Sequence, residues 1–405
     1  MNADRAWRSS KRSAVPPFAV MSILTRVAEL RAEGREVISL CAGEPAQGAP
    51  SAVRRRLAEL MSDRTPLGYS ETFGIRPLRE QLAAHYERWY GLDVPVEQIA
   101  ITTGSSGAFL LAFLAGFEHG DRVAMTRPGY PAYRNILSSL GNQVVELDCG
   151  PDDDYRLRVE QVDRAHREAP LAGLVIASPA NPTGTMVEPA LLADLTGWCR
   201  EHGVRLVSDE IYHGITGTGS PGSCAWSHDR SAVVVSSFSK YWGMTGWRLG
   251  WALVPADLVG AVDALAGNLA LCAPVPAQHA AVAAFTEPSY AEAEAAVTAF
   301  ADARTLLLAA VDELGWTGVA PADGAFYVYA DISGVLGRHA DSPSWCAALL
   351  EEQGVALTPG TDFDPVHGGT AVRVSLAAGP EAVAAALVRI QRFQRAGGMR
   401  TSAPA

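Results

Sequence analysis

Short runs of apolar, mostly β-branched residues alternate with longer helical stretches through the middle of the chain. The strand-like runs cover residues 99–102, 123–126, 144–147, 174–177, 205–208 and 232–236. Helical stretches such as residues 107–117 and 189–201 lie between several of them. Parallel strands are typically continuous apolar runs, because helices cover both faces of their sheet. The alternation therefore predicts an α/β fold with a mostly parallel sheet and right-handed crossovers.

One further run, residues 248–254, follows the run at 232–236 too closely for a full crossover helix, so we expect it to be antiparallel. The two ends of the chain have a different pattern. Expected helices cover residues 19–36, 290–314 and 342–353, and expected strands cover 37–40, 325–331 and 371–376. We therefore predict a large domain over residues 46–285, a smaller α+β domain from residues 13–45 and 286–396, and flexible tails at 1–12 and 397–405.

The composition excludes several classes of partner. With 33 Lys and Arg against 44 Asp and Glu, the formal net charge of −11 argues against general affinity for nucleic acid or anionic membranes. The longest apolar run, residues 108–117, is too short to span a bilayer, which takes about 20 residues. The six cysteines form no CxxC pair and the nine histidines no HxxxH or HExxH pattern. We therefore expect no metal site, and reduced thiols in a cytoplasmic enzyme.

Lys240 ends the string SSFSK, which directly follows a buried strand-like run. Burial disfavours the charged form of a lysine, and a neutral amine forms an imine with an aldehyde. The hydroxyls of Ser237 and Ser239, with the guanidinium of Arg248, are suited to binding a phosphate. An ordinary surface loop with a lysine and an arginine would be the alternative explanation.

The string SSFSK with an arginine eight residues later resembles the Schiff-base signature of the class I/II pyridoxal phosphate (PLP) aminotransferases. The resemblance runs from about residue 37 to residue 373, with several spaced motifs in the family's order. It implies PLP fold type I, in which a large domain with a mostly parallel seven-stranded sheet, covered by helices, joins a smaller α+β domain made from both chain ends. It also implies that PLP is the cofactor, bound to Lys240.

Two motifs at strand ends match cofactor-binding residues of that family. The string SPANPTG resembles the P-x-NPTG turn, so Asn181 is expected to bind the ring hydroxyl oxygen of PLP and the Asn181–Pro182 bond is a candidate cis peptide. The string SDEIY resembles D-E-x-Y, which assigns Asp209 to the pyridine nitrogen and Tyr212 to the same ring oxygen. An ionised carboxylate keeps that nitrogen protonated, and the protonated ring then accepts electrons. A plain turn and a helix N-cap are the structural alternatives, and Glu210 is expected to be structural.

Two more motifs concern the phosphate and the ring face. The loop TTGSSGA lies between a strand and a helix, where small residues and a helix N-terminus favour an anion. The resemblance assigns Ser105 and Ser106 to the PLP phosphate. In the string RPGYPAY, Tyr130 matches the aromatic residue that stacks on the pyridine ring, whereas Tyr133 is expected to be a packing residue.

Three residues concern the substrate and a partner subunit. Arg373 in VRVS matches an arginine that binds the substrate α-carboxylate with two hydrogen bonds, a geometry that lysine cannot reproduce. Gly43 in AGEP matches a glycine whose backbone approaches that carboxylate, and Asn181 is expected to contact the substrate as well. Tyr69 matches a tyrosine that reaches the phosphate of the neighbouring subunit, which implies a homodimer; a core aromatic residue is the alternative.

The resemblance implies ping-pong transamination from an amino acid to a 2-oxo acid, with Lys240, Asp209 and Tyr212 as catalytic residues. Residues 268–274 hold no arginine for a second carboxylate, so a small neutral or aromatic amino acid is the expected donor; an arginine or lysine at another position, such as the N-terminal segment, is the alternative source of that charge. Another PLP reaction on the same scaffold is the alternative: a C–S β-lyase, a synthase or cyclase, or a decarboxylase. A non-catalytic regulator is a further alternative, but the motif at Gly43 comes too early for the DNA-binding domain that precedes such proteins.

Overall fold

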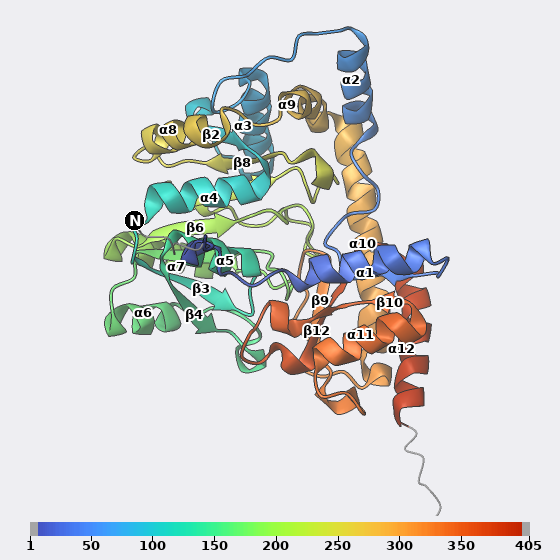
Figure 1. The fold of residues 1–405 in the computed structure, drawn as a ribbon. Helices are drawn as coiled ribbons and strands as arrows, with labels where there is room; N and C mark the ends of the chain where they lie inside the picture. The colour runs from blue at the N-terminus through green and yellow to red at the C-terminus, as the bar shows by residue number, and fades with distance from the viewer. Residues whose placement is uncertain (1–6, 399–405) are drawn as a thin grey trace, which may run out of the picture.

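The computed structural model describes residues 7–398, and its largest sheet has seven strands in the order β2-β8-β7-β6-β5-β3-β4 (Figure 1). These are β2 (Ile99–Thr102), β3 (Arg122–Arg127), β4 (Gln143–Asp148), β5 (Gly173–Ala177), β6 (Arg205–Asp209), β7 (Val233–Ser237) and β8 (Gly250–Leu253). Strands β3 to β7 pair in parallel, whereas β8 runs antiparallel to both β2 and β7. The predicted mostly parallel sheet and its antiparallel run are confirmed.

Helices cover both faces of this sheet. In β5, Leu174 and Ile176 belong to one hydrophobic cluster and Val175 to another, because successive side chains of a strand point to opposite faces. The second cluster contains α4 (Gly104–Gly116), α5 (Pro131–Leu140) and α8 (Val259–Ala270). The first contains α3 (Arg76–Tyr90), α6 (Val159–Glu168) and α7 (Pro189–His202). The covering explains why the strands are continuous apolar runs.

The sequence sets the ends of these helices locally, as α7 illustrates. Pro189 stands at its first position, where a missing N–H costs no hydrogen bond. Gly203 ends it with a φ of 65°, and its N–H bonds back to the carbonyls of Cys199 and Arg200. Helix and strand therefore meet at defined points, which fixes where each strand end lies.

Two small sheets join the N-terminal and C-terminal parts of the chain. Strand β1 (Ile38–Ser39) pairs in parallel with β10 (Val355–Ala356), and β12 (Ala371–Ser375) lies between β11 (Thr358–Pro359) and β9 (Tyr327–Asp331). The helices around them are α1 (Ala19–Ala32), α10 (Glu287–Leu314), α11 (Ser342–Gln353) and α12 (Pro380–Gly398). In Figure 1 the blue helix α1 lies among the orange and red C-terminal elements. The smaller α+β unit from both chain ends is therefore present, as predicted.

Helix α10 has 28 residues and packs against α12 at one end and against α2 (Ser51–Ser62) at the other, where α9 (Val275–Ala281) also lies. The exact domain bounds stay a prediction. Regular structure reaches into both segments expected as tails, since a 3-10 helix covers Lys11–Ser13 and α12 continues to Gly398. Residues 1–6 and 399–405 lie outside the described residues. Within residues 7–398, every helix is too short or too polar to cross a membrane.

Candidate active site

One pocket lies at the carboxyl ends of β5, β6 and β7 and at the N-terminus of α4, the edge at which open α/β sheets bind ligands. Ten of the twelve predicted site residues line it. They are Gly43, Ser105, Ser106, Tyr130, Asn181, Asp209, Tyr212, Lys240, Arg248 and Arg373. The exceptions are Ser237 and Tyr69. The structure thus brings together residues from seven separate motifs.

Lys240 follows β7, and its amine lies in desolvated surroundings. Nζ donates a hydrogen bond to the carbonyl oxygen of Gly43 at 2.6 Å. Burial, and after it the nearby guanidinium of Arg373, lower the pKa of Lys240 to about 8. A larger fraction of this amine is therefore neutral near pH 7 than of an ordinary lysine.

Asp209 is the last residue of β6 and is only 4% exposed. Its Oδ1 accepts a hydrogen bond from the backbone N–H of Ile211 at 3.0 Å, and its Oδ2 accepts one from the hydroxyl of Tyr133. Burial raises the pKa of Asp209 to about 6, although both hydrogen bonds favour the carboxylate and oppose the rise. The group is therefore still mostly ionised at neutral pH.

Tyr133 has a second role besides the packing expected from the sequence. Its ring packs edge-on against Phe109, with centroids 4.9 Å apart, while its hydroxyl donates to Asp209. Burial, together with the Asp209 charge, holds the pKa of Tyr133 well above its usual value, so the hydroxyl keeps its proton. The packing expectation was incomplete because a sequence does not reveal which buried tyrosine reaches a buried acid.

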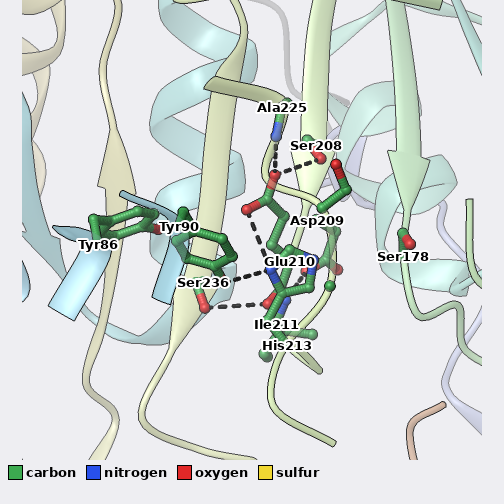
Figure 2. Close-up of polar contacts among 12 residues, drawn as sticks. Tyr86, Tyr90, Ser178, Ser208, Asp209, Glu210, Ile211, His213, Ala225 and Ser236 are labelled. Atoms are coloured by element: carbon green, nitrogen blue, oxygen red, sulfur yellow. Dashed lines mark hydrogen bonds and ion pairs between the residues drawn. The ribbon is translucent and has the colours of Figure 1, made fainter. Parts of the chain in front are cut away.

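Glu210 follows Asp209 but does not line the pocket. Figure 2 shows its carboxylate bonded to the backbone N–H of Ala225 at 2.8 Å and to the hydroxyl of Ser208 at 3.1 Å. His213 lies 3.5 Å from it and also bonds Tyr90. Burial raises the pKa of Glu210 to about 7 and lowers that of His213 to about 3. These contacts lie behind the strand end and agree with the structural role expected for Glu210.

Tyr327, in β9, is a lining residue that the sequence did not suggest. Its hydroxyl lies 2.8 Å from the hydroxyl of Tyr212. A Cβ atom added to Gly43 would lie 2.0 Å from the Tyr327 hydroxyl oxygen, so only glycine fits there. The apolar run of residues 325–331 indicated the strand but not which of its side chains face the pocket.

Arg373 lies in β12, only 3% exposed, and its guanidinium is held from several sides. It donates to Asn181 Oδ1 at 2.9 Å, to Thr358 Oγ1 at 3.2 Å and to the carbonyl of Cys41. The rings of Tyr327 and Phe363 lie 4.5 and 4.7 Å from its central carbon. Its Nε has no hydrogen-bond partner among the described residues. A buried cation with a free donor is suited to an incoming carboxylate.

The opposite end of the pocket is suited to a phosphate. Ser105 and Ser106 stand in the first turn of α4, and Arg248 covers that turn so closely that a Cβ on Gly104 would lie 2.4 Å from Nη2. Ser239 also lines this end of the site. Amides of a helix N-terminus, hydroxyls and a guanidinium together favour a dianion.

Two predicted residues lie elsewhere. The side chain of Ser237 is buried at the end of β7, where it donates to the carbonyl of Leu249 at 3.1 Å and bonds Ser239 at 2.7 Å. It supports Ser239 rather than lining the pocket, because β7 ends at Ser237, whose hydroxyl bonds Leu249 in the segment beside it, whereas Ser239 stands in the turn beyond the strand. Tyr69 is 84% exposed and lies outside the pocket of its own chain. A core role for Tyr69 is therefore wrong.

The groups that line this pocket fit PLP chemically. They supply an amine for its aldehyde, a carboxylate for its ring nitrogen, and hydroxyls with a guanidinium for its phosphate. The expected cis peptide Asn181–Pro182 is present. No three His, Cys, Asp or Glu side chains of the part that the structure describes lie close enough to hold a metal ion.

Known proteins similar to this chain agree with that chemistry. The family described as aminotransferase class I and II matches residues 35–390. The valine–pyruvate aminotransferase of Mycobacterium tuberculosis is 49% identical over 95% of this chain and 97% of its own length. The aspartate/prephenate aminotransferase of Thermus thermophilus is 34% identical over 95% of this chain and 98% of its own.

Solved structures give the same result. An aminotransferase from Mycobacterium tuberculosis superposes with a TM-score of 0.92 at 48% identity, covering 96% of this chain and 100% of that one. The aspartate aminotransferase of Thermus thermophilus with maleate has a TM-score of 0.89 at 32% identity, with the same coverage. The chain therefore belongs to the class I and II aminotransferases, and it is a PLP-dependent transaminase of fold type I.

Proposed function

We propose that this enzyme moves the amino group of a small neutral amino acid, aliphatic or aromatic, to a 2-oxo acid. The observation that carries the proposal is the lining of the pocket, where Phe18, Val20, Ile211 and Phe363 share one cavity with Arg373. An apolar side chain gains free energy by leaving water for such a wall. The name of the 49% identical relative, a valine–pyruvate aminotransferase, supports an aliphatic donor.

The charges of the pocket support the same choice. Among the described residues, the lysines and arginines that line it are Lys240, Arg248 and Arg373. The first is the reacting amine, the second lies at the phosphate end, and the third is proposed to bind the α-carboxylate. A donor with a second carboxylate would therefore find no further cation, and burying an unpaired charge is costly.

We assign the cofactor contacts residue by residue. Lys240 would bond the aldehyde carbon, Asp209 the ring nitrogen, Asn181 and Tyr212 the ring oxygen, Tyr130 the ring face, and Ser105, Ser106, Ser239 and Arg248 the phosphate. When bound, PLP supplies a carbonyl that captures the amino group and an electron sink that makes the Cα–H bond acidic. The ring can accept electrons only while its nitrogen is protonated, and an ionised Asp209 would keep it so.

Lys240 would move the protons. With a pKa lowered to about 8, its amine can accept a proton from Cα and return it to the cofactor carbon, as general bases and acids do. Arg373 and Asn181 would fix the substrate carboxylate on the side of the pocket where Gly43 leaves room. The donor and the acceptor would use this one site in turn, which predicts ping-pong kinetics.

The assembly is also proposed. Tyr69 is exposed between α2 and α3, and it would reach the phosphate end of a second copy of the chain in a homodimer. We further propose a cytoplasmic location, because all six cysteines are unpaired and thiols stay reduced in that compartment.

A stoichiometry experiment tests the reaction. Purified enzyme carrying PLP is mixed with valine, alanine, phenylalanine, aspartate or glutamate without any 2-oxo acid, and the 2-oxo acid formed is measured. Transamination predicts one equivalent per site with the neutral donors, and continued turnover only after pyruvate is added. Continuous release of CO2 and amine without an acceptor would instead indicate a decarboxylase, and continuous release of pyruvate, ammonia and thiol from added S-methylcysteine would indicate a C–S β-lyase. Preference for aspartate would overturn the donor class.

A further inference from the structure

The carboxylate of Asp362 lies at the wall of the pocket and holds the N-terminus of α1. Its Oδ1 accepts a hydrogen bond from the backbone N–H of Ala19 at 3.1 Å, and its Oδ2 accepts one from Val20 at 3.4 Å. These are the first amides of the helix, and the N-cap residue Phe18 has no side-chain cap of its own. Asp362 therefore supplies, from the far end of the chain, the acceptor that an N-cap normally provides.

The helix end that Asp362 holds forms one side of the pocket. Phe18, Val20 and Met21 line the cavity, and we call these three residues the roof. The ring of Phe18 lies 5.9 Å from that of Tyr130. The roof is apolar, so it would face the side chain of a bound amino acid rather than its carboxylate.

The two ends of α1 are held in different ways. Val27 and Leu30, in its second half, are buried in a hydrophobic cluster with Leu350 and Ala356. No residue of its first turn is buried, and Met21 is 62% exposed. The position of the roof therefore depends on the hydrogen bonds to Asp362 more than on burial.

Asp362 is also joined to the carboxylate-binding end. The next residue, Phe363, stacks on the guanidinium of Arg373. Among the described residues no lysine or arginine forms an ion pair with the Asp362 carboxylate; Arg134 reaches only its backbone oxygen, at 3.4 Å. Its negative charge is balanced by the partial positive charge of the α1 N-terminus and is open to the cavity.

We propose that Asp362 is a specificity-determining residue, which holds the apolar roof over the substrate and rejects donors that carry a second carboxylate. The inference rests on the proposed function, since it explains how the same site selects neutral donors. Holding the roof requires only an acceptor, whereas rejecting acidic donors requires the charge.

Two variants of the holoenzyme separate these effects. Asp362→Ala removes acceptor and charge, so the KM for valine should rise roughly fivefold, the loss expected for one N-cap, with a smaller change in kcat. Asp362→Asn keeps an acceptor of the same size and should leave that KM closer to the wild type. Because the like charge is gone, Asp362→Asn should also raise kcat/KM for glutamate relative to valine several-fold.

Hydrogen exchange supplies a readout that does not depend on turnover. The amides of residues 19–22 should exchange faster in Asp362→Ala than in Asp362→Asn. A matched control is Glu292→Ala, which removes the acceptor of the Ser51 N–H at the start of α2, outside the pocket. This control should speed exchange at α2 and leave the KM for valine unchanged.

The outcomes distinguish the proposed function, a preference for neutral donors, from the proposed role of Asp362 in that preference. If wild-type enzyme prefers acidic donors, the proposed function fails, whatever the exchange data show. If the wild type prefers neutral donors but Asp362→Ala changes neither the KM nor the exchange at residues 19–22, Asp362 does not hold the roof. If Asp362→Asn leaves the discrimination against glutamate unchanged, its charge has no part in selection.

Discussion

The pocket has two sides that are built in opposite ways. One side, which we call the floor, consists of residues on strands or in the turns that follow them: Asn181, Asp209, Lys240 and Arg373. Asp209 and Arg373 are 4% and 3% exposed and each is fixed by several hydrogen bonds. The roof is formed by one half-exposed helix end held by a single carboxylate.

This difference suggests a division of roles, in which the floor carries out the reaction and the roof selects the substrate. The groups that would bind the cofactor and move protons are held by the ends of buried strands. Those groups could move only if the core around the strands rearranged. The groups that would contact the substrate side chain can shift or mutate without disturbing that core. Aminotransferases with aspartate and with valine in their names can therefore share the fold seen here. Four substitutions, ordered by the size of the expected effect, test the division.

Lys240→Ala should have the largest effect, because no other group in the floor can move the proton. We expect kcat to fall by at least about 10²- to 10⁴-fold, and the absorbance of lysine-bound cofactor to disappear. Lys11 and Lys240 are the two lysines of the chain, so Lys11→Ala is a complete control. Borohydride reduction of the holoenzyme should fix the cofactor covalently to the peptide that contains Lys240. If the cofactor were found on Lys11 instead, the assignment would be refuted.

Arg373→Lys should lower kcat/KM for all amino donors by roughly 10- to 100-fold, the range expected for lost hydrogen bonds to a charged group. The loss should be similar for valine and phenylalanine, since the floor binds what they share. Arg389→Lys, at a surface pair with Glu36, serves as the control. A loss confined to one donor would place Arg373 with the roof and break the comparison.

Tyr133→Phe should lower kcat about fivefold at neutral pH by removing one hydrogen bond from Asp209. That bond lowers the pKa of Asp209, so its loss should raise the pKa further. The carboxylate must be ionised, and the acid limb of the pH profile should therefore move to higher pH. Tyr90→Phe, which loses its bond to His213 behind the strand, should leave that limb in place.

Phe18→Ala should have the smallest effect, roughly a threefold higher KM for neutral donors with little change in kcat, because a partly exposed apolar contact is lost. Trp7→Ala removes an exposed ring from the N-terminal segment and is the control. Steady-state kinetics with valine and phenylalanine measure both. If Phe18→Ala lowered kcat as much as Tyr133→Phe, the roof would belong to the chemical machinery.

The sequence predicted the floor better than the roof for a physical reason. Lys240, Asp209 and Asn181 lie in short strings beside strands, and parallel strands bring their carboxyl ends to one edge. Contacts between distant segments leave no such local pattern. The bond from Asp362 to Ala19 joins residues 343 positions apart, and the Tyr133–Asp209 and Tyr212–Tyr327 contacts depend on packing that motifs do not specify.

Ser237 shows that even a recognised motif does not tell which of its side chains face the ligand. The string SSFSK gave two candidate hydroxyls for the phosphate, and the structure turns Ser237 inward and Ser239 toward the pocket. Which one faces the ligand depends on where β7 ends, and strand boundaries are the least certain part of a sequence-based prediction.

The pairing of β1 with β10 affects how the enzyme is made. Ile38 is synthesised long before its ladder partner, Val355, which leaves the ribosome only after the whole seven-stranded sheet has been translated. Until then Gly43 has no fixed place beside Lys240, and Arg373 has not been translated. The seven-stranded sheet can form first, as domains do during synthesis, but a complete binding site cannot arise before β12, with Arg373, has emerged and paired.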